Sequence, residues 1–244
     1  MFSAIVEMSN KTSHEGVAMT LTLVVPILGP PGVGKTTLTL ALNDDPRRHT
    51  FRLRDQVPAD VLAATAGTVE HLGWIDTGIV DQTLRSYLYS VSHRDVDVVL
   101  LDNFPGSAAQ VSLLLDALAH SAPMASVEPI EMRADSKVLR NRARHRRVCQ
   151  RCEKDPVADP RMPAKPSLLD DWACGKCGAL LHFRRGDAPR LLKARTKRFD
   201  RSIDEIRAAF TAKGVDITIL DATLSTDHAV QMVVPMLNSR SPIS

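Results

Sequence analysis

The sequence is poor in aromatic residues and contains no apolar run of membrane-spanning length. Phenylalanine, tyrosine and tryptophan make up 4% of the 244 residues, so the core has to be built mainly from aliphatic side chains. The longest apolar candidate, residues 21–28, has the length of a strand, whereas a membrane span needs roughly 18 residues. The first residues include Glu7 and lack a basic start followed by an apolar segment, which argues against a secretory signal. We therefore expect a cytoplasmic protein without a membrane partner.

A strong charge of either sign is also missing. The formal net charge is +3, and the 24% of charged and 44% of apolar residues are ordinary for a globular protein. This mild charge gives little reason to expect a nucleic acid or membrane partner. We also expect a monomer whose partners are small molecules. The length suits one domain with one or two inserted lobes. Residues 1–18 are polar and unpatterned, and we expect either a disordered extension or a natural start at Met19.

Cysteine is scarce, and its four copies form two Cys-x-x-Cys pairs. Cys149 and Cys152 are separated by 21 residues from Cys174 and Cys177. Each pair can offer two thiolates to one tetrahedral Zn²⁺, and four thiolates leave no open position for catalysis. Disulfides or buried free thiols are the alternatives, but two matched pairs without a secretory signal favour a metal. We predict a structural zinc site that folds a proline-rich lobe, residues 148–187, which is too small for a core of its own.

A phosphate-binding loop stands near the beginning of the chain. Residues 29–36 read GPPGVGKT and satisfy G-x-x-x-x-G-K-[ST], between a strand pattern at 20–28 and a helical pattern. Glycines let backbone N–H groups surround a phosphate, and the helix start adds its positive end. Lys35 would lie near the transferred phosphate of ATP, and the Thr36 hydroxyl would bind Mg²⁺. The predicted ATP contacts come from Gly29, Gly32, Val33, Gly34, Lys35, Thr36 and Thr37.

A second buried strand pattern, residues 96–101, ends at Asp102. An acidic residue at that place holds Mg²⁺ through water in such domains, whereas the alternative is a cap or turn aspartate. Alternating strand and helix patterns predict an α/β fold with a three-layer parallel-sheet core. Further strands are expected at 127–132 and 215–220, and helices at 110–120, 136–147, from about 190 to 210, and 228–237.

The segment LLDNFPGSAAQ, residues 100–110, resembles the L-D-G-F-P-R-T-x-x-Q signature of adenylate kinases and other nucleoside monophosphate kinases. An arginine-rich helix ending RHRRVC, the two cysteine pairs and CGALLHFRRGD then follow in the order of that family. The resemblance implies Mg²⁺-dependent transfer of the ATP γ-phosphoryl group to a nucleoside monophosphate. It implies a core at 19–147 and 188–244, an acceptor-binding insert at 50–90, and a zinc lid at 148–187.

The resemblance also implies roles for single residues. Arg142 matches the arginine that packs on the donor adenine, and Gln110 matches the glutamine that reads the acceptor base. Arg146, Arg184 and Arg195 match arginines that hold the transferring phosphoryl group. Such transfer depends mainly on positioning and on neutralising phosphate oxygens, for which planar guanidinium groups are suited.

Five arginines fall within residues 140–147. If the predicted helix continued to 147, Arg142 and Arg146 would share one face, and the other three, Arg140, Arg144 and Arg147, another. Beside a phosphate loop and a lid, this run favours nucleotide binding. A nucleic-acid patch and a solvated face are the alternatives.

The chain departs from the family pattern mainly on the acceptor side. Gly106 replaces an arginine of the signature, and FRLRDQV replaces a T-G-D-x-x-R motif, leaving Arg54 as a weak substitute. After the lid, Gly186 replaces the first aspartate of a pair and leaves Asp187. Two other functions therefore stay open: a nucleotide-binding regulator that has lost the reaction, and a nucleic-acid-binding ATPase. The sequence does not identify the acceptor nucleotide.

Overall fold

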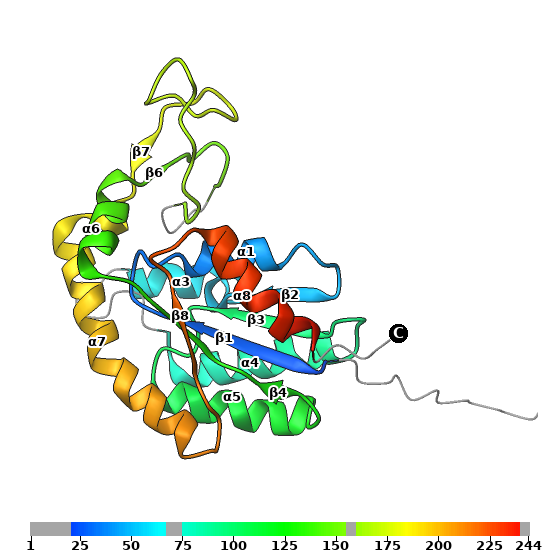
Figure 1. Ribbon diagram of the computed structural model, residues 1–244. Coiled ribbons are helices and arrows are strands. Elements are labelled where there is room, and N and C mark those ends of the chain that lie inside the picture. Colours follow the sequence, from blue (N-terminus) through cyan, green and yellow to red (C-terminus); the bar gives the residue numbers. More distant parts are fainter. Residues whose placement is uncertain (1–20, 67–74, 155–159, 240–244) are drawn as a thin grey trace, which may run out of the picture.

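A computed structural model describes residues 21–66, 75–154 and 160–239, arranged around a parallel sheet (Figure 1). In these ranges, five strands follow the order β2-β3-β1-β5-β8, and the short β4 also pairs with β1. All the pairings in this sheet are parallel. The strands are β1 (Leu23–Leu28), β2 (Arg48–Phe51), β3 (Val98–Asp102), β4 (Ser126–Val127), β5 (Ile130–Arg133) and β8 (Thr218–Asp221).

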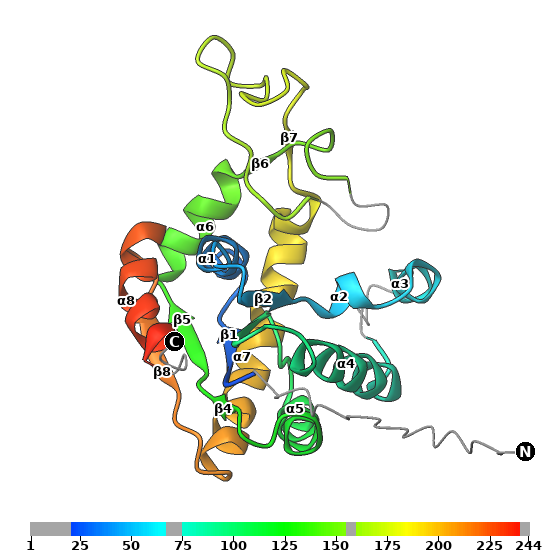
Figure 2. The same cartoon turned by 90° about the vertical axis from the view of Figure 1, so that its right-hand side faces the viewer.

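Helices cover both faces of the sheet, which gives the predicted three-layer α/β core. On one face lie α4 (Thr77–Ser92), α5 (Ala108–Ser121) and α7 (Pro189–Thr211). On the other lie α1 (Lys35–Leu42) and α8 (Thr226–Asn238), as Figure 2 shows. None of the helices in the described ranges is long and apolar enough to cross a membrane.

Period-two alternation in the central strands produces the two layers of the core. Leu23, Val25 and Ile27 of β1 pack against α1 and α8, whereas Val24 and Leu28 pack toward α4, α5 and α7. These side chains are almost completely buried. Because β1 lies inside the sheet, the loop that follows it begins at the middle of the carboxyl edge. Ligands of open parallel sheets bind at that edge.

The central sheet contains a strand that the sequence did not indicate. The polar segment RHTF forms the edge strand β2, paired in register with β3. The short helices α2 (Leu53–Gln56) and α3 (Ala59–Ala66) follow before α4. The sequence also suggests two helical patterns around a break at Gly73, and that residue lies outside the described ranges.

The arginine-rich helix is shorter than predicted. Helix α6 (Ser136–His145) ends before Arg146, whose backbone is extended, with φ −67° and ψ 124°. Arg147 belongs instead to β6 (Arg147–Val148), which pairs antiparallel with β7 (His182–Phe183). The prediction that Arg146 shares a helix face with Arg142, and Arg147 one with Arg140 and Arg144, is therefore wrong, because the helix ends two residues before 147.

A buried ion cluster fastens α7 to the sheet. Glu131 of β5 is 1% exposed and accepts hydrogen bonds from Arg207 of α7 over 2.6 and 2.8 Å. Arg133 donates to the same carboxylate over 2.7 Å. Burial acts to raise the pKa of Glu131, but the hydrogen bonds of the two arginines outweigh it and lower that pKa to about 2. Helix α7, which carries Arg195 near its start, is thus anchored near its far end.

Candidate nucleotide-binding site

The loop after β1 has backbone angles that glycine adopts more easily than other residues. Gly29, Gly32 and Gly34 have φ angles of 145°, 86° and 107°, in a region that side chains disfavour. A Cβ atom on Gly29 would lie 2.7 Å from the carbonyl oxygen of Met132 in β5. The loop can therefore approach β5 closely and lead directly into α1, whose first backbone N–H groups point toward the loop.

Lys35 folds back over this loop. Its Nζ donates to the carbonyl oxygens of Gly29 over 2.6 Å and Pro30 over 3.1 Å. Burial lowers the pKa of Lys35, Asp102 acts to raise it, and three nearby arginines lower it further, leaving it at about 7. The three are Arg195, Arg146 and Arg184. An excess of positive charge at this position favours an anion with several charges.

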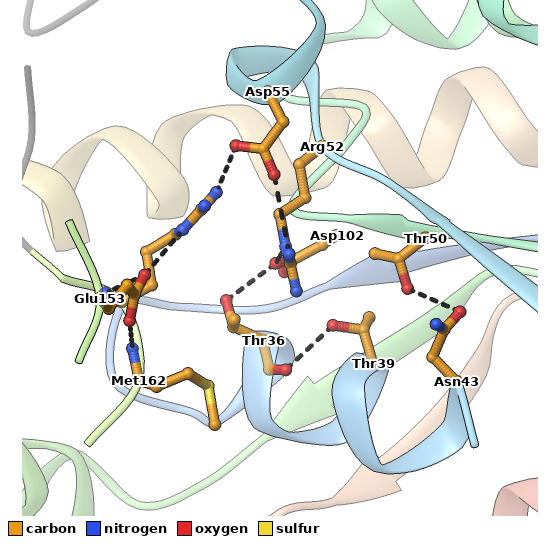
Figure 3. Close-up of polar contacts among 10 residues, drawn as sticks. Thr36, Thr39, Asn43, Thr50, Arg52, Asp55, Asp102, Glu153 and Met162 are labelled. Atoms are coloured by element: carbon orange, nitrogen blue, oxygen red, sulfur yellow. Dashed lines mark hydrogen bonds and ion pairs between the residues drawn. The ribbon is translucent and has the colours of Figure 1, made fainter. Parts of the chain in front are cut away.

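Asp102 lies beside the loop because β3 neighbours β1, with Ile27 opposite Asp102 in register. Its Oδ2 accepts hydrogen bonds from the Thr36 hydroxyl over 2.8 Å and from Nε of Arg52 over 2.7 Å (Figure 3). Its Oδ1 is buried and has no hydrogen-bond partner among the described residues. A carboxylate oxygen and a hydroxyl oxygen suit a hard cation, so this pair fits a magnesium ion and its water shell.

Asp187 gathers the arginines on either side of the lid. It lies in the 3₁₀ turn η1 (Arg185–Asp187) directly before α7, and its side chain is 3% exposed. Nε and Nη2 of Arg146 each donate to this carboxylate over 2.6 Å. Arg184 and Arg195 each place an Nη1 atom 3.6 Å from its Oδ1. One carboxylate thus aligns three guanidinium groups.

The crowding of arginines is visible in the pKa of Arg195, which falls to about 10. Burial is the main cause, and Arg184, Arg146 and Arg54 lower it too, against the raising effect of Asp187. Nη1 of Arg195 also donates to the carbonyl oxygen of Gly186 over 2.9 Å. Cations therefore outnumber carboxylates here, and a polyphosphate would relieve their repulsion.

Arg142 lies on the other side of the loop. Its guanidinium group donates to the carbonyl oxygens of Val33 over 3.3 Å, and of Thr223 and Leu224 over 3.4 Å each. It therefore joins the phosphate loop to the turn after β8. This placement is compatible with a nucleotide base beside Arg142, and the role stays a prediction.

Gln110 and Gly106 face one another after β3. The backbone N–H of Gly106 donates to Oε1 of Gln110 over 2.7 Å. A separate cavity of about 620 Å³ runs along α4 beside β2, α2 and α3. Neither Gln110 nor Arg54 is among the described residues that line that cavity, so it does not coincide with the predicted acceptor site.

The four cysteines of the lid come together as predicted. Their Sγ atoms all lie within 4.8 Å of one another, with Cys149 3.5 Å from Cys177 and Cys152 3.7 Å from Cys174. Tetrahedral zinc with Zn–S bonds of about 2.3 Å needs sulfur separations of roughly 3.8 Å. Backbone hydrogen bonds lower the pKa of the Cys174 thiol to about 7, whereas a hydrogen bond with Cys177 raises the pKa of the Cys152 thiol to about 12. The cluster is compatible with zinc.

The lid around this cluster has little apolar core. Buried residues group as Cys149, Cys174 and Leu181, with a few partly buried neighbours. Outside them, Arg147 stacks on the rings of Phe183 and Trp172, at 3.6 and 4.7 Å from the ring centres. Arg147 therefore supports the lid by cation–π contact rather than forming part of a solvated helix face.

A loop of backbone amides with cations gathered above it is built to hold a row of phosphates, which defines the class as P-loop nucleotide-binding proteins. No protein-family model matches the chain. Among curated proteins, the adenylate kinase of Sphingopyxis alaskensis is 25% identical over 224 residues, covering 90% of this chain and 99% of the relative. That of Thermococcus gammatolerans is 22% identical, covering 79% and 84%, and that of Borrelia duttonii 25%, covering 71% and 78%. Similarity over most of the chain supports assignment to the adenylate kinase family.

The structure gathers most of the residues that the sequence singled out. Lys35, Thr36 and Asp102 meet at the loop, and the lid arginines surround Asp187 above it. Their roles in binding, like those of Val33, Thr37 and Gln110, stay predictions. Sequence reasoning missed Arg52, Asp55 and Arg161. The position of Arg52 beside Asp102 could be recognised only once β2 was known. Arg52 directly follows β2, and β2 pairs with β3, which ends at Asp102.

Proposed function

We propose that this chain is a nucleoside monophosphate kinase-like phosphotransferase, which moves the γ-phosphoryl group of ATP to a nucleoside monophosphate. The observation that carries the proposal is the cluster of Arg146, Arg184 and Arg195 around Asp187, close enough to the glycine loop for the three arginines to lower the pKa of Lys35. Phosphoryl transfer spreads negative charge over several oxygens, and fixed cations stabilise that charge without reorganising. The adenylate kinase relatives support the same reaction class.

The proposed mechanism is a direct in-line transfer without a covalent enzyme intermediate. The loop amides and Lys35 would hold the phosphates of ATP, while the lid arginines would steady the phosphoryl group as it moves. Thr36 and Asp102 would hold Mg²⁺, which when bound neutralises phosphate charge and orients the oxygens. Closure of the lid, residues 148–187, would exclude water and so limit hydrolysis.

The lid, the insert at 50–90 and the core at 19–147 and 188–244 form the proposed division of the chain. We propose that zinc bound by the four cysteines supplies the folding energy that the small lid core lacks. The expectation of a cytoplasmic monomer with nucleotides as its small-molecule partners stays a prediction.

The direct test incubates the protein with ATP, Mg²⁺ and each nucleoside monophosphate in turn, and follows new diphosphate by chromatography. Diphosphate formed from one monophosphate supports the kinase. Tight ATP binding without transfer to any acceptor would instead support the nucleotide-binding regulator, which Gly106 favours. Hydrolysis stimulated by nucleic acid would support the ATPase.

A further inference from the structure

A line of alternating charges connects the lid with the phosphate loop (Figure 3). Arg161 of the lid donates from Nη1 to Oδ1 of Asp55 in α2 over 2.7 Å. The other oxygen of Asp55 lies 3.7 Å from Nη1 of Arg52. Arg52 in turn donates to Asp102, whose Oδ2 also accepts from Thr36. The line therefore crosses from lid to insert to loop.

The lid end of this line is fixed within the lid itself. The carboxylate of Glu153 accepts hydrogen bonds from the backbone N–H groups of Arg161 and Met162 over 2.9 Å each. Nε of Arg161 lies 3.4 Å from the same carboxylate. Two backbone bonds hold this segment in place, so Arg161 reaches Asp55 as part of the lid.

Arg52 is more buried than a surface ion pair requires. Its side chain is 16% exposed, and its Nη2 is buried without a hydrogen-bond partner among the described residues. Buried guanidinium N–H groups are normally satisfied, because an unmade hydrogen bond to a charged group is costly. An oxygen-bearing ligand next to Asp102 and Thr36 would supply the partner.

The same region lacks a guanidinium group from the loop after β3. Gly106 stands where the family signature has arginine, and its backbone N–H binds Gln110. Arg52 approaches Asp102 from the neighbouring strand β2. Phe51 of β2 pairs with Leu101 of β3, which places the next residue, Arg52, beside Asp102. A guanidinium group thus reaches Asp102 from the end of a neighbouring strand.

On the basis of the proposed function, we infer that Arg52 binds the phosphate of the acceptor, and that Asp55 and Arg161 are positioning residues. Nε of Arg52 stays on Asp102, while Nη2 meets a phosphate oxygen of the acceptor. Asp55 holds the guanidinium group from the insert side. Arg161 fixes Asp55 when the lid lies over the insert, so lid position sets the place of Arg52.

Equilibrium binding tests Arg52 without requiring turnover. Arg52→Ala and Arg52→Lys are titrated with nucleoside monophosphates in the presence of a non-hydrolysable ATP analogue and Mg²⁺. We expect Arg52→Ala to weaken monophosphate binding about 10- to 100-fold, the size of one charged hydrogen-bonded contact, with analogue binding changed less than about threefold. Arg52→Lys should recover only part of the loss, because lysine cannot bridge two groups as a planar fork does.

A second-site variant separates a ligand role from a structural one. Adding Gly106→Arg to Arg52→Ala should restore at least part of the monophosphate affinity, since it returns a guanidinium group to the same region. If Arg52→Ala instead weakens the analogue and raises the Mg²⁺ requirement while monophosphate affinity stays unchanged, Arg52 merely supports Asp102 and the inference is overturned. Thermal melting of each variant checks that it folds.

The lid end is tested by Arg161→Ala beside Arg151→Ala, an exposed lid arginine outside the line. Arg161→Ala should weaken monophosphate binding about three- to tenfold, and the control should not. Asp55→Asn combined with Arg161→Ala should be no worse than the more severe single variant, because both act through one contact. Equal effects of Arg161→Ala and the control would remove Arg161 from the mechanism.

The two proposals fail in different ways. If wild-type protein binds a monophosphate through Arg52 but forms no diphosphate, the proposed kinase reaction is wrong and the assignment of Arg52 stands. If diphosphate forms and Arg52→Ala changes neither acceptor affinity nor the KM for the acceptor, the reaction stands and the assignment of Arg52 is wrong. Absence of any monophosphate binding by the wild type overturns both.

Discussion

The proposed donor and acceptor sides of this site differ in how many separate segments of the chain supply their residues. On the donor side, consecutive residues of one loop create the phosphate cradle, and Asp187 collects arginines from the two segments that flank the lid. On the proposed acceptor side, Gly106 takes the place of the signature arginine, and the buried cation beside Asp102 is Arg52, which follows an edge strand. Under this proposal, the site keeps its charge pattern while one half is supplied from new positions.

Zinc removal should have the largest effect, because the lid and its flanks supply Arg146 and Arg184 to one side of the proposed site and Arg161 to the other. Structural zinc in small domains contributes about 10–16 kcal/mol of apparent binding free energy, so its loss should unfold the lid and displace Arg146 and Arg184. We expect about one zinc per chain by elemental analysis, and protease-sensitive lids after chelation or in Cys174→Ser. The neighbouring Lys176→Ala should behave like the wild type. A lid that keeps its protease resistance without metal would contradict the prediction.

Asp187→Asn should destabilise the protein without nucleotide by about 3–5 kcal/mol, because three arginines lose a buried counter-charge. Urea unfolding measures this loss, with Asp200→Asn on the exposed side of α7 as the control. Saturating ATP should reduce the difference, since the polyphosphate replaces the missing charge. A difference that ATP leaves unchanged would mean that the arginines do not meet phosphate.

Lys35→Ala should lower kcat about 10²- to 10³-fold, because it removes a fixed cation from the transferred charge. Lys197→Ala, an exposed lysine of α7, is the matched control. Rates are measured at saturating ATP with the acceptor found in the panel. Near-normal turnover by Lys35→Ala would mean that the phosphate loop does not take part in the transfer. The comparison between a donor side and an acceptor side would then lose its basis.

The smallest expected effect is that of pH on the affinity for ATP. The pKa of Lys35 is about 7 in the folded protein against its ordinary 10.5, so the unfolded chain binds more protons between those values. The contribution of Lys35 to stability therefore rises as pH increases through this window. ATP binds the protonated amine, so its affinity should fall above pH 7 by at most about tenfold per pH unit.

Calorimetry in buffers of different ionisation enthalpy measures how many protons the protein takes up when ATP binds. Binding at pH 8 to 9 should take up close to one proton in the wild type and none in Lys35→Ala. Equal uptake by both proteins would assign the proton to a different group.

The sequence was sufficient wherever the information lay within one continuous segment. The glycine loop, the buried strand before it and the two cysteine pairs could all be predicted, because spacing alone determines their chemistry. Strand β2 could not, since RHTF has no apolar alternation and is recognised only through its pairing with β3. The end of α6 was missed for a similar reason: no glycine or proline marks it, and Arg146 leaves the helix to reach Asp187.

Contacts between distant segments were the remaining gap. Asp55 and Arg161 are 106 positions apart, and neither belongs to a recognisable motif. Their meeting depends on where the folded lid stands over the insert, which no single segment encodes. The residues of the proposed donor side could thus largely be listed from the sequence. Those of the proposed acceptor side could be identified only from the three-dimensional structure.

The hydrogen bonds of Lys35 to Gly29 and Pro30 carry a consequence for affinity. The two carbonyl oxygens and an incoming phosphate compete for the same amine, so the carbonyls hold the lysine in place until a ligand replaces them. A cradle held open by its own side chain loses little disorder on binding. The cost is that each nucleotide must first exchange two good hydrogen bonds for its own, which tempers tight binding and favours release after turnover.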